Sequence, residues 1–481
     1  MPIADRRLHS GLHPLLDPLM DPLALVLLLV AAVLTWGQLQ QRAMRPAHSP
    51  RAGTEARVLE LKWGLTSYLQ ENKIIKKKPA TPRLSPKDRN NPWNVAVEAV
   101  MLEACGEYGE AVKLLELTPE GAFRACWKTA YETVYEATHK TACEAGHGEA
   151  YGPEEQDIAL VMNGLGNGLA SHLLSHNLQA APPSDHRGHR DHPEGEAWHF
   201  SRGAPPPGYW RIIDTYAFKA MAFFFAVFLI VVGAAAGIGI AIWMWLKPKS
   251  MPMPMPNPPQ FQMSTAFALR ACLGWYVAFL LSGTVGAWVE SLIPLGAWVL
   301  PVAYGFHAVL GVAFICIAEK ESPAALWKKI SPAGRAWIST GLQCLALALG
   351  LAMLLTMAIS PFMPNGQPQL ELMEFIRANS GLVPFLVIFG TVAVLGPAFE
   401  EVFFRGFLLP MMRRGMSPWL AVLLSGALFG AFHLEAQALP VLMLLGCVMG
   451  LAFMRSGNIK AAILLHGCWN GGVFLFQRLL L

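Results

Sequence analysis

Long apolar segments dominate the chain from residue 215 onward and most strongly constrain its fold. A helix that crosses a lipid bilayer needs about 20 consecutive, mostly apolar residues. A helix satisfies its own backbone N–H and C=O groups by internal hydrogen bonds, which lipid cannot supply. Nine stretches qualify, of which the first is short: residues 23–39, 215–246, 265–287, 292–317, 337–361, 382–410, 417–434, 438–454 and 460–478. We therefore predict an all-α fold, a polytopic transmembrane helix bundle of about eight to nine spans.

Charged residues are concentrated between residues 40 and 208. Only 15% of the 481 residues are charged and 54% are hydrophobic, whereas about 25% of an average soluble domain is charged. Apolar residues recur at helical spacing in residues 91–151 and 154–178, which predicts a helical soluble insert. The net charge of +4 gives no indication of nucleic-acid binding. The lipid bilayer is an expected partner, and the insert has a partner that the sequence does not identify.

These patterns divide the chain into four predicted regions. Residues 1–39 form an N-terminal segment with a membrane anchor, and residues 40–208 form the soluble helical region, which ends in a linker rich in His and Pro. Residues 209–375 form membrane helices that precede a C-terminal core, residues 376–481. The core contains the ionisable residues that are considered below.

Basic residues predict the orientation of the chain in the membrane. Lys and Arg follow the second, fourth, sixth and eighth apolar segments, and the loops between them are poor in both: the basic residues are Lys247, Lys249, Lys320, Lys328, Lys329, Arg335, Arg413, Arg414, Arg455 and Lys460. Cytoplasmic loops carry the excess of Lys and Arg in membrane proteins. The alternation therefore places the N-terminus inside, and the insert and the C-terminus outside.

Several candidate sites have simpler interpretations. His186, His189 and His192 lie three residues apart, a spacing that could bind a metal ion, but the surrounding Pro and Arg residues favour a solvated linker. The eight cysteines include no CxxC pair, so neither a zinc ribbon nor a redox motif is indicated. His307, in an apolar segment, is interpreted as a packing residue.

An unusual pair of acids lies in the segment PAFEEVFFRGF. Ionisable residues within a spanning helix are costly and usually mark a site or an ion pair. Glu401 and Arg405 are four residues apart, with the acid on the N-terminal side, so we expect an ion pair between them. Glu400 points about 100° away on the helix and lacks that partner. Such an acid is suited to act as a general base on water.

Two further polar motifs follow on later apolar segments. Phe429 and His433 are four residues apart, so the phenyl ring can flank the imidazole. His466 and Asn470 are also four apart and share one helix face. A ring N–H and an amide N–H that converge on one point resemble an oxyanion hole. Alone, each of these residues could equally be a hydrogen-bonding packing residue between helices.

The three motifs in this order resemble those of the CPBP family of intramembrane proteases, which includes the type II CAAX prenyl endopeptidases and bacteriocin-processing enzymes. They stand here as Glu400-Glu401-Val-Phe-Phe-Arg405, Phe429-Gly-Ala-Phe-His433 and His466-Gly-Cys-Trp-Asn470. The resemblance covers residues 380–478, and the segments EEVFFRGFLLP and LLHGCWNG are similar to cyanobacterial and plastid members.

The resemblance implies a role for each motif. Glu400 and His433 would activate the hydrolytic water, and His466 and Asn470 would polarise the scissile carbonyl. Glu401 and Arg405 would brace the helix, with Phe429 in support. Two mechanisms stay open: a zinc site made by Glu400, His433 and His466, or a metal-free glutamate mechanism, which Asn470 favours because it suits hydrogen bonding better than a zinc shell.

The resemblance also implies the function, an intramembrane endopeptidase that acts on a protein or peptide substrate at a plasma or thylakoid-type membrane. Two alternatives come from other classes. A catalytically silent scaffold would keep the motifs for structure and bind partner proteins. A proton-coupled transporter would relay protons through Glu400 and His433, but residues 215–361 contain no counterpart of the Glu-Glu motif, as an inverted repeat would require.

Overall fold

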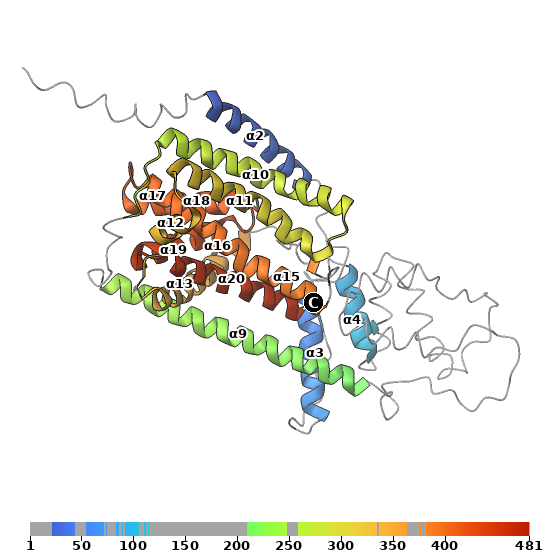
Figure 1. The fold of residues 1–481 in the computed structure, drawn as a ribbon. Helices are drawn as coiled ribbons and strands as arrows, with labels where there is room; N and C mark the ends of the chain where they lie inside the picture. Colours follow the sequence, from blue (N-terminus) through green and yellow to red (C-terminus); the bar gives the residue numbers. More distant parts are fainter. Residues whose placement is uncertain are drawn as a thin grey trace, which may run out of the picture. The chain divides into compact units, whose positions relative to one another are not determined.

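The computed structural model describes residues 22–43, 54–71, 92–104, 209–247, 258–333, 336–362 and 381–480, together with a few isolated positions (Figure 1). The described residues divide into two compact units. One lies within Met1–Arg45 and Phe228–Leu475 and is called the membrane unit below. The other, called the insert unit, lies within Pro46–Val227 and Phe476–Leu481.

Every described element is helical, so the predicted all-α transmembrane fold is confirmed. Among the described residues, seven helices are long and apolar enough to cross a membrane: Tyr216–Leu246, Thr265–Leu292, Gly296–Glu319, Trp337–Phe362, Leu382–Met412, Leu439–Ser456 and Ile459–Leu479. The predicted stretches 23–39 and 417–434 are helical too, but their apolar parts, Leu23–Gln38 and Pro418–Phe432, are shorter than a full span. All nine apolar stretches thus form helices, and the chain is an integral, multi-pass membrane protein.

The helices of the membrane unit are α2 (Pro22–Ala43), α9 (Tyr209–Leu246), which this unit shares with the insert unit, α10 (Thr265–Leu292), α11 (Val299–Glu319), α12 (Pro323–Ile330), α13 (Trp337–Ile359), α18 (Pro418–Phe432), α19 (Leu439–Ser456) and α20 (Ile459–Leu480). The span 382–412 is divided into α15 (Leu382–Gly390), η6 (Thr391–Leu395), α16 (Gly396–Glu401), η7 (Val402–Leu408) and α17 (Leu409–Met412). Short 3-10 turns, η4 (Gly296–Trp298) and η5 (Ser360–Phe362), precede α11 and follow α13.

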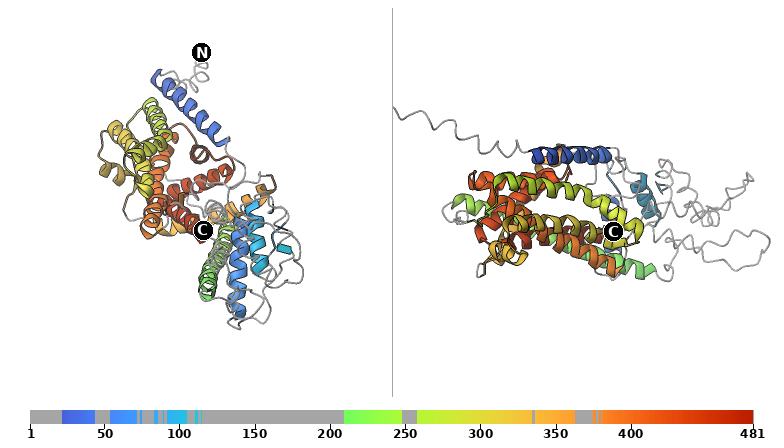
Figure 2. Two further views of the ribbon diagram at one scale, coloured as in Figure 1. Left: turned by 90° about the vertical axis from the view of Figure 1, so that its right-hand side faces the viewer. Right: turned by 45° about the horizontal axis from the view of Figure 1, so that its top comes forward.

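Helix α2 lies along α10, as Figures 1 and 2 show from three sides. The Thr35 and Tyr276 hydroxyls are 2.9 Å apart, and the Gln38 side-chain amide donates to the Leu280 carbonyl at 3.0 Å. Polar bonds of this kind join helices in lipid, where burial of apolar surface supplies little driving force between them. The predicted anchor segment is therefore packed on the membrane bundle.

Helices α9 and α13 approach each other through small residues. A Cβ atom on Gly237 would overlap the Ala346 carbonyl, and one on Gly350 would lie 2.7 Å from the Ala234 carbonyl oxygen. Two backbones can come this close only where no side chain intervenes. The run of small residues at 233–239 therefore sets this crossing.

Local signals in the sequence explain where several helices begin. Ser264, Ser322 and Ser417 each precede a helix and accept a hydrogen bond from a backbone N–H three residues on. Pro323 and Pro418 follow two of these caps at the first helical position, where a missing N–H costs nothing. At the end of α11, the Glu319 carboxylate accepts the backbone N–H groups of residues 262 and 263 at 2.9 Å. That contact fixes the chain as it enters α10.

The insert unit contains α3 (Thr54–Glu71) and α4 (Pro92–Ala104), in agreement with a helical insert. Its core includes two ion pairs. Arg57 bonds to Glu60 at 2.8 Å, and Arg89 bonds to both oxygens of the buried Glu98 at 2.8 and 2.6 Å. The bonds to Glu98 raise the pKa of the Arg89 guanidinium. The predicted helix at 154–178 and the linker with His186, His189 and His192 lie outside the described residues.

Candidate active site

The span 382–412 is one continuous helix with two π-helical stretches, η6 and η7. The Gly396 N–H bonds to the Thr391 carbonyl, five residues back, and the Leu409 N–H bonds to Phe404 in the same way. Each of these residues directly precedes a proline, Pro397 or Pro410 in the sequence. Proline supplies no N–H to the helix ladder, and membrane helices satisfy the freed carbonyls by local π adjustments.

The first π stretch leaves the Val392 carbonyl accessible to another helix. Gly396 bonds to Thr391 instead of Val392, and Pro397, next in line, has no N–H to give. The Asn470 side-chain amide replaces the missing backbone donor: its Nδ2 donates to the Val392 oxygen at 3.2 Å. Helix α20 comes close at this level because Gly467 has no side chain: a Cβ there would lie 2.6 Å from the Ala393 oxygen.

A buried ion pair follows directly. Arg405 Nη1 donates to Glu401 Oε1 at 2.8 Å, so the pair expected from the spacing is present, and neither side chain is exposed. Arg405 Nη2 also donates to the Gly446 carbonyl of α19 at 3.0 Å. His466 Nδ1 lies 2.9 Å from the same Glu401 oxygen. Glu401 therefore joins α16, η7 and α20, a broader role than bracing its own helix.

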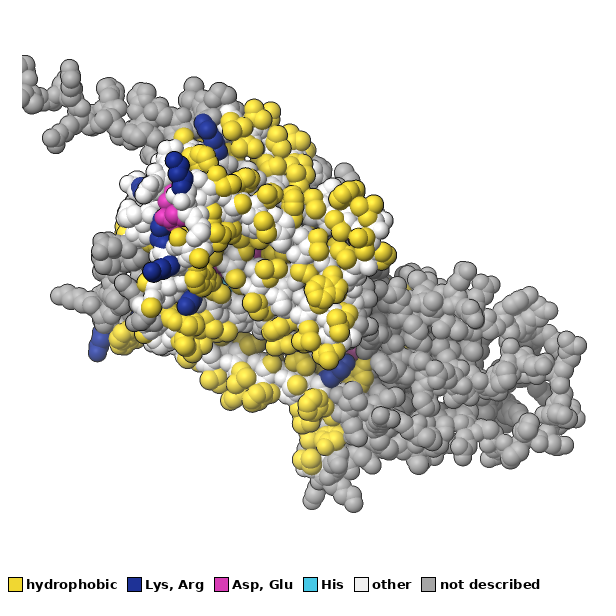
Figure 3. Space-filling model, viewed as in Figure 1, with side chains coloured by type: hydrophobic (Ala, Val, Ile, Leu, Met, Phe, Trp, Pro, Cys, Tyr) yellow, Lys and Arg dark blue, Asp and Glu magenta, His cyan; other side chains and the backbone are white. Residues whose placement is uncertain are grey.

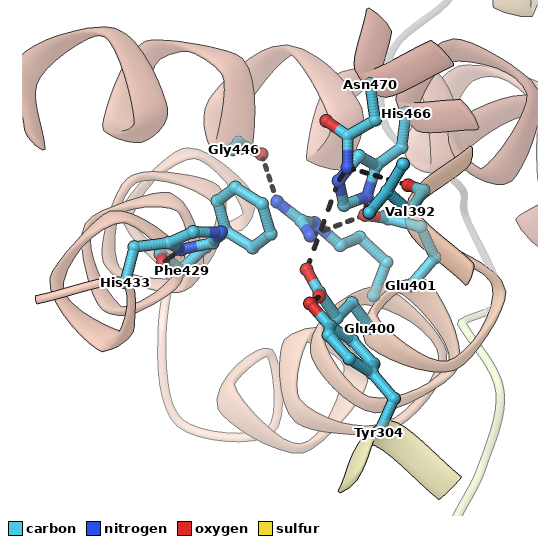
Figure 4. Close-up of polar contacts among 10 residues, drawn as sticks. Tyr304, Val392, Glu400, Glu401, Phe429, His433, Gly446, His466 and Asn470 are labelled. Carbon is cyan, nitrogen blue, oxygen red and sulfur yellow. Dashed lines mark hydrogen bonds and ion pairs between the residues drawn. The ribbon is translucent and has the colours of Figure 1, made fainter. Parts of the chain in front are cut away.

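Glu400 faces a different set of groups (Figure 4). Its Oε1 accepts a hydrogen bond from the Tyr304 hydroxyl of α11 at 3.2 Å. Its Oε2 is buried, has no hydrogen-bond partner among the described residues, and lies 3.9 Å from His466 Nε2. Tyr304 thus holds Oε1 of the carboxylate, whereas Oε2 faces the His466 imidazole at a distance too long for a direct hydrogen bond.

His466 and Asn470 are bonded to each other. Asn470 Nδ2 lies 3.2 Å from His466 Nε2 and also donates to Val392. An amide nitrogen can only donate, so Nε2 is the acceptor and the ring proton is on Nδ1, where Glu401 accepts it; this tautomer is assigned from the partners. The shared helix face was expected. In the resting arrangement, however, the two side chains do not point two donors at one common position.

Phe429 connects the remaining histidine to the site. His433 Nδ1 lies 2.7 Å from the Phe429 carbonyl oxygen, and the two rings are 4.8 Å apart. The same phenyl ring contacts His466 edge-on at 5.4 Å, and the Arg405 guanidinium lies 4.5 Å above it. Phe429 is completely buried. Its ring therefore flanks both histidines and the ion pair, where the motif spacing predicted contact with His433 alone.

A metal ion does not fit this donor set. The described residues contain no group of three His, Cys, Asp or Glu side chains placed to hold one. Both ring nitrogens of His466 are committed, to Glu401 and to Asn470, and His433 Nδ1 is directed at a backbone carbonyl.

Two residues of α11 belong to this region and were not predicted from the sequence. Tyr304 bonds to Glu400, and the His307 ring lies 5.1 Å from the Tyr304 ring, almost completely buried among aromatic side chains. His307 does pack as expected, but it packs beside the site. The available signal was a Tyr and a His three residues apart, on one face of an apolar helix.

Comparison with known proteins identifies a family whose sequence model covers the span with the two acids and the helices α18 to α20. The sequence model of a family described as Rce1-like, type II CAAX prenyl endopeptidase, matches residues 382–472. The chain carries an Rce1-like domain. This confirms the resemblance drawn from the three motifs, and the Rce1-like domain includes every residue of those motifs. Tyr304 lies outside it.

One curated relative extends the comparison. An uncharacterized 24.3 kDa protein of Escherichia coli is 31% identical over 104 residues, which are 21% of this chain and 48% of that protein. The chain thus spans about half the length of the curated relative that it matches. No solved structure matches the chain.

Proposed function

We propose that the Rce1-like domain is an intramembrane endopeptidase that uses Glu400 as the general base on water. The observation that carries the proposal is the 3.9 Å gap between Glu400 Oε2 and His466 Nε2. A water molecule at about 2.8 Å from both atoms would span such a gap at roughly a right angle. It would donate to Glu400 Oε2, since the Nε2 lone pair already accepts from Asn470, and its own lone pairs would stay available for attack.

The reaction then follows from where the protons lie. The water oxygen bonds to the scissile carbonyl carbon, its proton passes to Glu400, and the carbonyl oxygen becomes an oxyanion. The family resemblance assigns His433 to the same step; its Nδ1 is directed at the Phe429 carbonyl here. The proton then passes to the leaving nitrogen as the C–N bond breaks.

Glu401 and Asn470 give His466 a second state. The Glu401 carboxylate on Nδ1 stabilises an imidazolium, as the acid of a catalytic triad does. When the proton taken from water passes from Glu400 Oε2 to Nε2, 3.9 Å away, that nitrogen no longer accepts from Asn470. The ring N–H and the amide N–H are then both available to the oxyanion, until the proton moves on to the leaving nitrogen. The hydrogen bond between Asn470 Nδ2 and His466 Nε2 in the resting site thus holds side by side the two nitrogens that would act as donors in the predicted oxyanion site.

The class of substrate is proposed from the family alone. A protein or peptide substrate at the membrane fits an endopeptidase, and the matching family is described as a type II CAAX prenyl endopeptidase. The position of the domain in a multi-pass bundle fits cleavage at a plasma or thylakoid-type membrane. The donor set favours the metal-free mechanism over the zinc alternative.

The proposal is tested by comparing the membrane peptidomes of cells that carry wild type, Glu400→Gln or Glu290→Gln at matched expression. Glu290 is a suitable control because its carboxylate accepts backbone N–H groups of residues 295 and 296, at the end of α10. We expect one set of peptides in wild type and Glu290→Gln that is lost in Glu400→Gln, and that persists when chelators are added.

Other outcomes favour the alternatives. Identical peptidomes, with a cellular phenotype that both wild type and Glu400→Gln restore, would support the scaffold. Proton flux in liposomes that depends on Glu400, without any cleaved peptide, would support the transporter. Loss of the peptides with chelators would restore the zinc mechanism.

A further inference from the structure

Helix α11 packs against the span that carries the two acids. It contacts η6, α15, α16 and η7 in turn, and so lies along the whole central part of that span. From this position the Tyr304 hydroxyl reaches Glu400 Oε1 at 3.2 Å. The Rce1-like domain begins only at residue 382, so this contact comes from outside the domain.

The Tyr304 ring is held on two sides. Gly396, four residues before Glu400, lies against its edge: a Cβ on Gly396 would lie 3.0 Å from Tyr304 Cε1. On the other side the His307 ring is 5.1 Å away and rests in turn on Phe399 at 5.5 Å. The hydroxyl therefore cannot turn away from the carboxylate without displacing packed rings.

The partner of this hydroxyl is a carboxylate that is 12% exposed, which distinguishes Tyr304 from an ordinary packing tyrosine. The Tyr304 hydroxyl donates to a carboxylate oxygen of Glu400, the proposed general base, at 3.2 Å. Tyr276, by contrast, bonds to the neutral hydroxyl of Thr35 at 2.9 Å. The two tyrosines lie in the same membrane unit, but the hydroxyl of Tyr304 bonds to a carboxylate and that of Tyr276 to another hydroxyl.

We propose that Tyr304 is a positioning residue for the hydrolysis, which holds Glu400 Oε1 so that Oε2 faces His466 and the water between them. The proposal rests on the proposed function of the domain. The hydrogen bond to Oε1 restricts rotation of the Glu400 carboxylate and so fixes the direction of Oε2. General base catalysis depends on the alignment of the base with the water that it deprotonates. Without the hydroxyl, Glu400 keeps its place on α16 but loses the fixed direction of Oε2.

The test uses the full-length protein in liposomes and a fluorogenic peptide that contains a sequence cleaved by wild type in cells. Tyr304→Phe is expected to lower kcat by about 10- to 100-fold, as a small misalignment of a catalytic group does, and to leave KM within about twofold. Tyr276→Phe, which removes a hydroxyl from the same unit, is the matched control and is expected to leave kcat unchanged.

A second variant tests the alignment from the other helix. Gly396→Ala would push on the Tyr304 ring, so we expect it to lower kcat on its own and to add little in a Tyr304→Phe background. An unchanged kcat in Tyr304→Phe, or equal losses in Tyr304→Phe and Tyr276→Phe, would overturn the inference. Absence of cleavage by wild type would instead overturn the proposed function.

Discussion

At the scale of single residues, Glu401 is the most heavily used side chain of the site. Its Oε1 accepts from Arg405 and from His466, whereas its Oε2 is buried and has no hydrogen-bond partner among the described residues. A charge in this position is stabilised only by its immediate neighbours. Loss of Arg405 would therefore leave an uncompensated carboxylate in the middle of the bundle.

Arg405→Met is accordingly expected to lower the free energy of unfolding by about 3–5 kcal/mol, the usual cost of breaking a buried ion pair. Methionine fills a similar volume, so the loss reflects charge more than packing. The measurement is reversible unfolding of the purified protein in mixed micelles.

The second half of this experiment pairs the change with Glu401→Gln. If the ion pair is the cause, Arg405→Met should cost much less when residue 401 is already neutral, because no charge is then left unpaired. Equal costs in both backgrounds would show that Arg405 stabilises the bundle through its bond to the Gly446 carbonyl instead.

The sequence predicted those contacts of the site that lie within one helix. Spacings of four residues placed Glu401 with Arg405 and Phe429 with His433 because neighbours on a helix face are fixed by its geometry. The contacts of Tyr304 with Glu400 and of His466 with Glu401 could not be predicted, since they depend on which helices cross and at what height. No short-range pattern in the chain specifies that.

At the scale of secondary-structure elements, the π stretches show what the apolar pattern leaves out. Pro397 and Pro410 could have been read as breaks, but the helix continues through both by shifting its bonds to the fifth residue back. Whether a helix breaks or shifts depends on partners for the freed carbonyls. For Val392 that partner is Asn470, which lies 78 residues away in sequence.

Helix crossings give the prediction at this scale. Gly237→Ala is expected to destabilise the protein by about 1–3 kcal/mol, the range for forcing an extra methyl group into a packed contact, since its Cβ would overlap the Ala346 backbone. Gly239 lies on the same helix with nothing within 4 Å of its Cβ position. Gly239→Ala should therefore be neutral or slightly stabilising, because alanine favours a helix.

Unfolding of the two alanine variants in the same micelles makes the comparison. Helix propensity acts equally on both, so the difference between them reports the α9–α13 crossing alone. Similar stabilities for the two variants would mean that the two helices are not in close contact in the membrane.

At the scale of the whole molecule, the apolar pattern predicted the class of fold, and the basic residues predict the orientation of the chain in the membrane. Lys247, Lys320, Lys328 and Lys329 belong to helix ends and to the short α12, and Arg413 and Arg414 follow α17. Figure 3 shows Lys and Arg side chains of the membrane unit gathered along one edge of the visible face, where α12 and α17 lie in Figure 1. The remaining surface of this unit in that view is largely apolar.

This one-sided distribution leads to a prediction about the orientation of the chain in the membrane. The test uses two single-cysteine variants in a background in which all eight cysteines are replaced by serine. Gly415→Cys lies next to Arg414, in a basic loop, and Ser291→Cys lies before a loop without Lys or Arg. Both positions are exposed. A membrane-impermeant maleimide applied to intact cells should label Ser291→Cys and spare Gly415→Cys, because basic loops stay in the cytoplasm. Permeabilised cells should show both labelled.

Labelling of Gly415→Cys alone in intact cells would reverse the orientation and would place the insert, if the first apolar helix spans, on the cytoplasmic side.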